Sequence, residues 1–121
     1  MRCVPVTPGG AKVKGRETEN LLVDWLHRNG APHAERRRLA GVADRGDVGG
    51  WPGVCVEVKS GAKVDVSGWL AELAVEVSNA NADVGFVAVR PKGRPDPEGW
   101  WAVMPLPALL RLLVDAGWAA T

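Results

Sequence analysis

The run VCVEVKS (residues 54–60) is the part of the sequence that decides the fold. Its alternation is typical of a β-strand, in which successive side chains point to opposite faces of the sheet. One face is expected to carry Val54, Val56 and Val58, and the other Cys55, Glu57 and Lys59. A carboxylate and an ammonium group therefore share one side of the strand, with their positions about 6–7 Å apart.

A glycine-rich stretch, GVADRGDVGGWPG (41–53), precedes this strand. Its Pro-Gly step within 51–53 predicts a tight turn between two strands. If the chain reverses there, Asp47 lies on the neighbouring strand beside Glu57. Asp44 is a rival for that position, but its spacing is less favourable and no glycine turn follows it directly.

Further helices and strands are expected on both sides of this pair of strands, from the periodicity of apolar residues and from turn-forming residues. In chain order they are a helix at about 15–29, a short polar strand or loop at 33–39, a helix at about 67–80 with Leu70, Leu73, Ala74 and Val77 inward, strands at 84–90 and 99–105, and a helix from Leu106 to about Asp115.

This order predicts an α/β fold, because helices interleaved with strands form layers around one sheet. A length of 121 residues suits a single domain spanning 1–121. The Pro/Gly-rich residues 1–13 lack periodicity and predict a flexible or extended N-terminal arm.

Asp47 and Glu57 are the candidate ligands of a metal ion. Two adjacent carboxylates repel one another, and the pKa of each rises unless a cation lies between them. Carboxylate oxygens, completed by water and a substrate phosphate, describe a Mg²⁺ site. Lys59 is placed to orient or help deprotonate an attacking water and to stabilise charge on a phosphate. The simpler interpretation is a charged strand face with a Glu57–Lys59 ion pair.

Glu19 is a further candidate, because it shares the inward stripe of the first helix with Leu22 and Leu26. If this helix packs against the face that carries Glu57, Glu19 can approach the metal or its waters. The alternative is a solvated carboxylate at the edge of the helix.

Together these residues resemble the PD-(D/E)XK nuclease superfamily, and within it the Holliday junction resolvases of archaeal and phage type. In that family the first helix opens with Lys-Gly and carries a glutamate four residues after the glycine. An aspartate then precedes a glycine turn, and the next strand reads apolar-Glu-x-Lys. The matching residues are Lys14-Gly15, Glu19, Asp47 and Val56-Glu57-Val58-Lys59. The proline usual before the aspartate is Gly46 here, and the likeness covers roughly residues 12–115.

The resemblance implies a restriction-endonuclease-like fold, a central mixed β-sheet flanked by helices. It implies metal-dependent hydrolysis of phosphodiester bonds in DNA four-way junctions by a homodimer, with Mg²⁺ or Mn²⁺ as cofactor. The implied catalytic residues are Glu19, Asp47, Glu57 and Lys59, and the first three are the metal ligands. This superfamily hosts several activities on one scaffold. A nicking or repair nuclease acting on duplex, flap or single-stranded DNA, and a non-catalytic DNA-binding module, therefore remain alternatives.

Basic residues are concentrated in the first half of the chain. Residues 1–63 carry 11 Lys/Arg against 7 Asp/Glu, and the remainder carries 4 against 7. Arginine suits bidentate contacts with phosphate, although a solvated surface is the ordinary interpretation of such a charge run. The candidate DNA contacts are Lys12, Lys14, Arg16, Arg36, Arg37, Arg38, Arg45 and Lys63.

Several other classes lack support in the sequence. Cys3 and Cys55 form neither a disulfide framework nor a zinc spacing, and Cys55 is expected to be a small buried side chain. The absence of a long apolar run or a secretory signal predicts a protein without a membrane partner, in the cytoplasm or, if phage-encoded, the host cytoplasm. No phosphate loop, GxSxG elbow or GxGxxG motif is present. Trp25, Trp51 and Trp69 are expected to pack in the core or an interface.

Overall fold

The computed structural model of this chain describes residues 7–37, 44–61 and 63–121, with side chains from residue 15 onward. Within these residues the elements are α1 (Thr7–Arg28), β1 (Glu35–Arg36), β2 (Val48–Gly49), β3 (Val54–Ser60), α2 (Val66–Ala80), β4 (Val84–Arg90), the short 3-10 helix η1 (Pro97–Gly99), β5 (Trp101–Val103) and α3 (Leu106–Asp115). The expected alternation of helices and strands is confirmed, and β1 settles that residues 33–39 contain a short strand.

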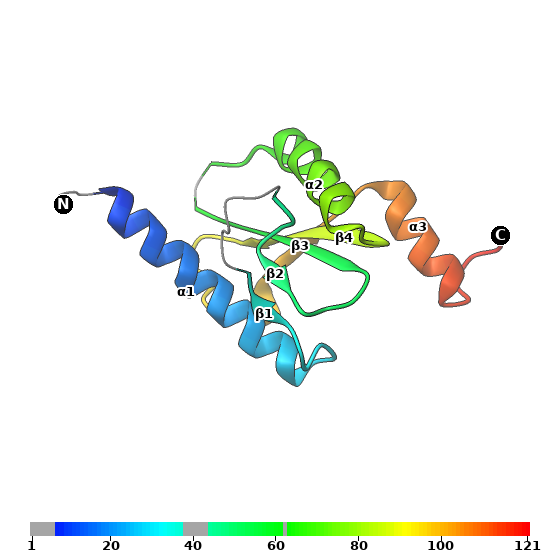
Figure 1. Cartoon of the computed structure of the whole chain (residues 1–121), viewed down its shortest axis with the longest axis horizontal. Helices are drawn as coiled ribbons and strands as arrows, with labels where there is room; N and C mark the ends of the chain where they lie inside the picture. The colour runs from blue at the N-terminus through cyan, green and yellow to red at the C-terminus, as the bar shows by residue number, and fades with distance from the viewer. Residues whose placement is uncertain (1–6, 38–43, 62) are drawn as a thin grey trace.

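The described strands form one sheet in the order β1-β2-β3-β4-β5 (Figure 1). β3 and β4 are parallel, and the other neighbours are antiparallel. Parallel neighbours need a crossover connection, which α2 provides. The structure therefore confirms a mixed sheet flanked by helices.

The two faces of the sheet bury separate apolar clusters. Leu22 and Leu26 of α1 pack with Val56 of β3. On the opposite face, Leu73 of α2 packs with Cys55, also of β3. The alternation along β3 thus directs its valines toward α1 and its other face toward α2.

The helix α2 approaches the sheet closely at Gly85 of β4. A Cβ at this position would clash with Cγ2 of Val77. The helix is capped at both ends, because the Asp65 carboxylate accepts a hydrogen bond from Gly68 N at 3.0 Å and Asn81 adopts a left-handed conformation with φ of 51°. The close approach turns the Val77 side of α2 toward β4, and the caps set where the helix begins and ends.

Two expected boundaries need correction. α1 begins at Thr7, not near residue 15, so the second half of the arm expected over 1–13 is helical, and residues 1–6 lie outside the described part. Two glycines at 9 and 10 disfavour a helix in the sequence pattern and explain the difference. β5 is shorter than the expected strand over 99–105 because η1 takes up Gly99.

The three tryptophans expected to pack do so. Trp25 and Trp51 are partly buried against the cluster beneath α1, and Trp69 against the cluster beneath α2. The Trp51 ring meets the ring of Phe86 edge to face, with centroids 6.1 Å apart. Packing accounts for all three side chains.

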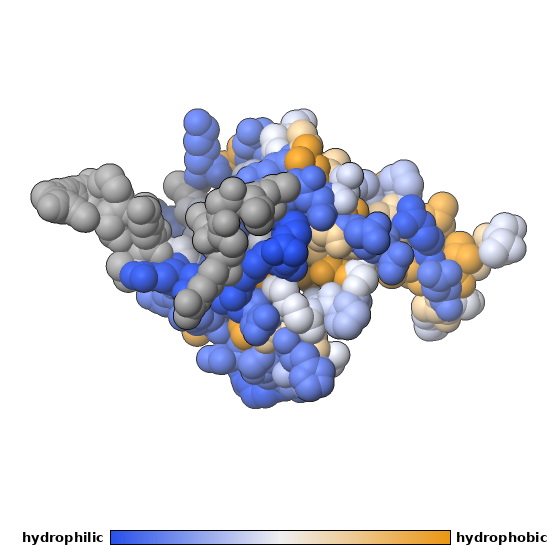
Figure 2. All heavy atoms as spheres, viewed as in Figure 1, coloured by the Kyte–Doolittle hydropathy of each residue, from blue (hydrophilic) through white to orange (hydrophobic). Residues whose placement is uncertain are grey.

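The last helix, α3, lies apart from the clusters that hold α1 and α2. None of the residues in 106–115 is buried; Leu106 is 75% exposed, and Trp118 just beyond the helix is 81% exposed. Figure 2 shows apolar side chains at the outer surface of this end of the molecule. No helix in the described ranges has both the length and the apolar character needed to cross a bilayer.

Candidate metal centre

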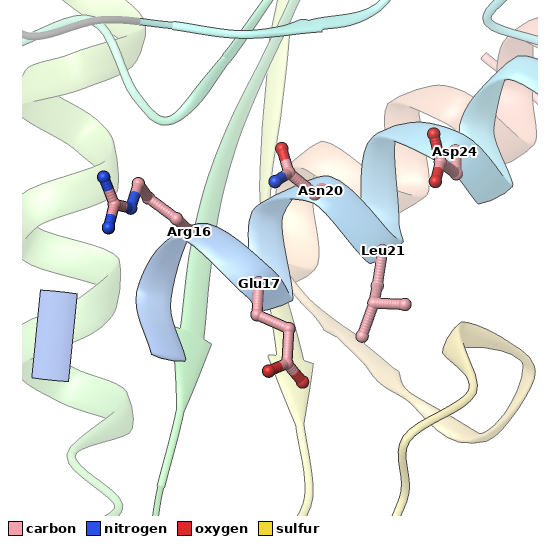
Figure 3. A pocket seen from close by; sticks show the side chains of 5 residues that line it. All are labelled: Arg16, Glu17, Asn20, Leu21 and Asp24. Atoms are coloured by element: carbon pink, nitrogen blue, oxygen red, sulfur yellow. The ribbon is translucent and has the colours of Figure 1, made fainter. Parts of the chain in front are cut away.

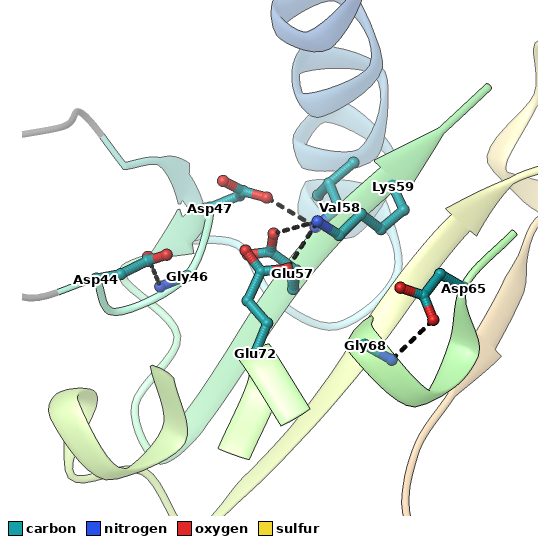
Figure 4. A network of polar contacts seen from close by, with 9 residues as sticks. All are labelled: Asp44, Gly46, Asp47, Glu57, Val58, Lys59, Asp65, Gly68 and Glu72. Atoms are coloured by element: carbon teal, nitrogen blue, oxygen red, sulfur yellow. Dashed lines mark hydrogen bonds and ion pairs between the residues drawn. The ribbon is translucent and has the colours of Figure 1, made fainter. Parts of the chain in front are cut away.

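The turn before β2 directs Asp47 toward β3. Gly46 adopts a φ of +92°, and a Cβ added there would lie 2.8 Å from the Val56 carbonyl oxygen. Glycine is therefore needed, and proline, with φ fixed near −65°, does not fit this turn. Asp47 N donates to Val56 O at 2.8 Å, and Val58 N donates to Asp47 Oδ2 at 2.8 Å. These bonds place the Asp47 carboxylate beside Glu57 (Figure 4).

Glu57 and Lys59 lie on the face of β3 that α2 covers. Glu57 is 5% exposed, and Lys59 Nζ lies 3.3 Å from Glu57 Oε2 and 2.7 Å from Glu72 Oε1 (Figure 4). Burial disfavours the charge on Lys59, but the carboxylates of Glu72 and Glu57 outweigh it and raise the pKa of the lysine. Lys59 is therefore a fixed positive charge in this arrangement, and it is not positioned as a proton acceptor.

Glu19 lies near Asp47, and it is not among the carboxylates that the structure groups around Glu57. The condition under which Glu19 would approach the metal is not met, because α1 packs on the valine face of β3 and not on the face that carries Glu57. Glu19 instead approaches Asp47, the residue just before the two-residue strand β2. Burial raises the pKa of Glu19 to about 7, and the charge of Asp47 adds to this. Arg36 Nη1 lies 3.8 Å from Glu19 Oε1 and partly offsets the effect.

Two further carboxylates come from α2. One oxygen each of Asp44, Glu57, Glu72 and Glu76 lies within 4.8 Å of the others, and these four residues, here called the α2-side cluster, could hold a metal ion. Glu72 and Glu76 were not among the residues predicted from the sequence. The sequence did carry a sign of Glu76: it follows Leu73 by three residues, so it lies on the same face of α2 and interrupts the apolar stripe there. Ala74, expected inward, is exposed.

Asp44 is held in place by the turn and by α2. Gly46 N donates to Asp44 Oδ1 at 2.9 Å, and Asn79 Nδ2 donates to Asp44 O at 2.7 Å. Asp44, the rival of Asp47 in the sequence, is the aspartate whose carboxyl groups with those of Glu57, Glu72 and Glu76, whereas Asp47 lies outside this group. Contact with Glu76 lowers the pKa of Asp44.

The buried carboxyl oxygens lack hydrogen-bond donors. Glu57 Oε1 and both carboxyl oxygens of Glu76 are buried and have no partner among the described residues. Burial, followed by the charge of Asp47, raises the pKa of Glu57 to about 7. Burial, with contacts to Asp44 and Glu57, raises the pKa of Glu76 to about 10. Burial also raises the pKa of Asp47, against the opposing effect of the Val58 N–H.

Such a group of carboxyls needs either shared protons or a cation to offset its charge. Its donor atoms are all carboxylate oxygens, which are the ligands that hard divalent cations prefer. The residues present therefore fit a cation of this class.

Cys55 shares the β3 face with Glu57 but is not a nucleophile. Its side chain is fully buried, and its Sγ donates to Arg45 O at 3.5 Å. Burial, with the charges of Glu76 and Glu57, raises the pKa of the thiol to about 11. The expected small buried cysteine is confirmed.

The candidate DNA contacts differ in exposure and in the contacts that they make. Arg36 pairs with Glu19, and Arg37 is partly buried with its Nη2 3.5 Å from Val48 O. Arg45 and Lys63 are exposed. The side chains of Lys12, Lys14 and Arg38 lie outside the described part of the chain.

Arg16 lies on the outer side of α1. Figure 3 shows it at an open groove lined by Arg16, Glu17, Asn20, Leu21 and Asp24. Two carboxylates share this groove with a single guanidinium, so its charge does not favour a polyanion.

Comparisons with family models, with curated proteins and with solved structures find no match to this chain. Function must therefore be inferred from the residues and geometry of the site.

Proposed function

We propose that this protein is a metal-dependent DNA endonuclease of the PD-(D/E)XK superfamily that acts on four-way junctions, as Holliday junction resolvases do. The main support is the convergence of Asp47, in the turn just before β2, with Glu57 and Lys59 of the adjacent strand β3. The mixed sheet, covered by α1 on one face and α2 on the other, is compatible with a restriction-endonuclease-like fold.

In this proposal Asp47, Glu57 and Glu19 hold a divalent cation, Mg²⁺ or Mn²⁺. A cation there would polarise a phosphoryl oxygen and make a bound water more acidic. The raised pKa values of Glu19 and Glu57 support this role, because a nearby positive charge would favour their ionised forms.

The remaining work falls to Lys59 and to the backbone of β3. The Lys59 ammonium, held by Glu57 and Glu72, can donate a hydrogen bond to the attacking water or to a phosphate oxygen as negative charge develops. The Val58 N–H orients the Asp47 carboxylate before substrate arrives. Both contacts reduce the reorganisation needed during the reaction.

A homodimer belongs to the same proposal, because a junction must be cut on two strands. The exposed leucines of α3 supply apolar surface for pairing with a second copy. Two alternatives remain. One is a nicking or repair nuclease that acts on duplex, flap or single-stranded DNA, and the other is a DNA-binding module without catalytic activity.

The deciding experiment incubates the protein with a labelled four-way junction and a matched linear duplex, in Mg²⁺ and in EDTA. Asp47→Asn is the inactive variant, and Glu35→Gln, an exposed carboxylate on β1, is the matched control. Paired nicks in the junction alone, lost in EDTA and in Asp47→Asn, would support the proposal. Cleavage of both substrates would keep the nuclease and discard the resolvase. Tight binding without cleavage in Mg²⁺ or Mn²⁺ would leave a DNA-binding module.

A further inference from the structure

We infer that the α2-side cluster (Asp44, Glu57, Glu72 and Glu76) is a divalent-cation site in its own right, separate from the Asp47 and Glu19 side of Glu57. The inference goes beyond the proposed nuclease activity, because cation binding can occur without DNA.

The geometry of the cluster is the first support. Its carboxylates come from the turn before β2, from β3 and from α2, and one oxygen of each lies within 4.8 Å of the others. Glu72 and Glu76 are four residues apart, so they lie on one face of the helix. Three segments of the fold therefore bring carboxyl oxygens together at one point.

The state of Glu76 is the second and independent support. Its side chain is fully buried, and no N–H or hydroxyl group among the described residues donates to either carboxyl oxygen. A glutamate is almost never fully buried unless it is paired. Lys59 pairs with Glu57 and Glu72, but no ion pair to Glu76 occurs in the described ranges. The Glu76 carboxyl therefore meets only the carboxyls of Asp44 and Glu57, and it lacks a cationic partner among the described residues.

The ligand set identifies the class of cation. All four donors are carboxylates, which favour hard cations such as Mg²⁺, Mn²⁺ or Ca²⁺ over softer metals. Glu57 is common to this cluster and to the contact with Asp47, so a cation here lies next to the proposed catalytic position. It would also tie Asp44 to α2, a link already made by the Asn79 amide.

The test is a calorimetric titration of Mn²⁺ into the full chain without DNA at neutral pH. Asp47→Asn should retain a Mn²⁺ site, because Asp47 lies outside the cluster. Glu76→Gln and Glu72→Gln should each weaken that site at least about tenfold, because ligand charge sets affinity in carboxylate sites. Glu35→Gln, an exposed carboxylate on β1, should bind Mn²⁺ as the wild type does.

Unchanged Mn²⁺ affinity in both α2 variants would overturn the inference, as would complete loss of binding in Asp47→Asn. If Glu76→Gln does not fold by circular dichroism, Glu72→Gln decides alone, since that side chain is 40% exposed. The two proposals can fail separately. Glu76-dependent Mn²⁺ binding without DNA cleavage would remove only the nuclease, and cleavage with Glu76-independent binding would remove only the cluster.

Discussion

The Asp47 carboxylate accepts a hydrogen bond from the backbone N–H of Val58 at 2.8 Å, so one of its two oxygens is already engaged by the sheet. An asparagine can accept the same bond, whereas an alanine cannot. We therefore expect Asp47→Asn to retain wild-type stability in EDTA and Asp47→Ala to lose about 1–3 kcal/mol, because Val58 N–H loses its acceptor. Both variants should lose cleavage. Urea unfolding measures the difference in stability between the two variants. Equal destabilisation by Asn and Ala would show that the Val58 N–H bond to residue 47 does not contribute to stability.

Lys59→Met should separate catalysis from cation binding. Loss of the ammonium should slow cleavage at least about 100-fold, the scale for loss of one preorganised donor. It should not weaken Mn²⁺ binding, because removal of a positive charge beside Glu57 and Glu72 leaves the site more negative. Single-turnover cleavage and calorimetry test the two halves. A parallel loss of Mn²⁺ binding would assign Lys59 a structural role instead.

The metal-free protein should become less stable as the pH rises from about 4.5 to about 7. Burial raises the folded-state pKa values of Glu57 and Glu19 from 4.5 to about 7, so the folded state holds more protons than the unfolded chain in this window. Each group contributes at most about 1.4 kcal/mol per pH unit. Scanning calorimetry in EDTA at pH 5.5 and pH 8 measures the change. Glu57→Gln should show a shallower dependence, and an unchanged slope would contradict this origin.

Cys55 should be inert in the folded protein. With a thiol pKa of about 11, only about one molecule in a thousand carries a thiolate at pH 8, and the side chain is buried. In a Cys3→Ser background, Ellman's reagent should find no reactive thiol before unfolding and one after it. Rapid reaction of the folded protein would show that β3 is accessible from the α2 side.

Gly46→Ala should damage the site more than Gly30→Ala does. Both glycines have positive φ, so both substitutions strain the backbone by about 1–3 kcal/mol. Only at residue 46 would the new Cβ meet an atom, the Val56 carbonyl oxygen at 2.8 Å, whereas nothing lies within 4 Å at Gly30. We expect cleavage to fall in Gly46→Ala alone, because Asp47 is displaced. Equal activity of the two variants would mean that the turn tolerates the shift.

Most of the fold follows from periodicity in the sequence. The alternation in VCVEVKS predicts β3, and the apolar run at 84–90 predicts β4. Both strands lie in the middle of the sheet, so their burial leaves a clear pattern of apolar residues in the sequence. The spacing of Leu70, Leu73, Ala74 and Val77 likewise predicts α2, although Ala74 proves to be exposed. The start of α1 could not be predicted in this way, because local propensity at residues 9 and 10 opposes the helix that forms.

Only the site residues that lie on segments with a clear apolar periodicity could be predicted from the sequence. Period-2 geometry places Glu57 and Lys59 on one face, but the side of α2 that meets them depends on the close approach at Gly85. Glu72 and Glu76 therefore escaped prediction. The Asp44 carboxyl lies beside Glu72 and Glu76 because Gly46 turns the chain with a positive φ. Residue propensities do not distinguish this turn from an ordinary β-turn, so the position of Asp44 could not be predicted.

The uncovered helix α3 has a consequence for hydrogen exchange. A ten-residue helix without a buried face is marginal in water, because its own backbone hydrogen bonds barely offset the entropy of ordering. Its amide protons should exchange with deuterium far faster than those of β3 and β4, which are paired on both sides. Slow exchange at residues 106–115 would appear only when another surface lies against the leucines. The exchange rates of these amides would then report assembly directly, and protection should grow with protein concentration if the covering surface is a second copy.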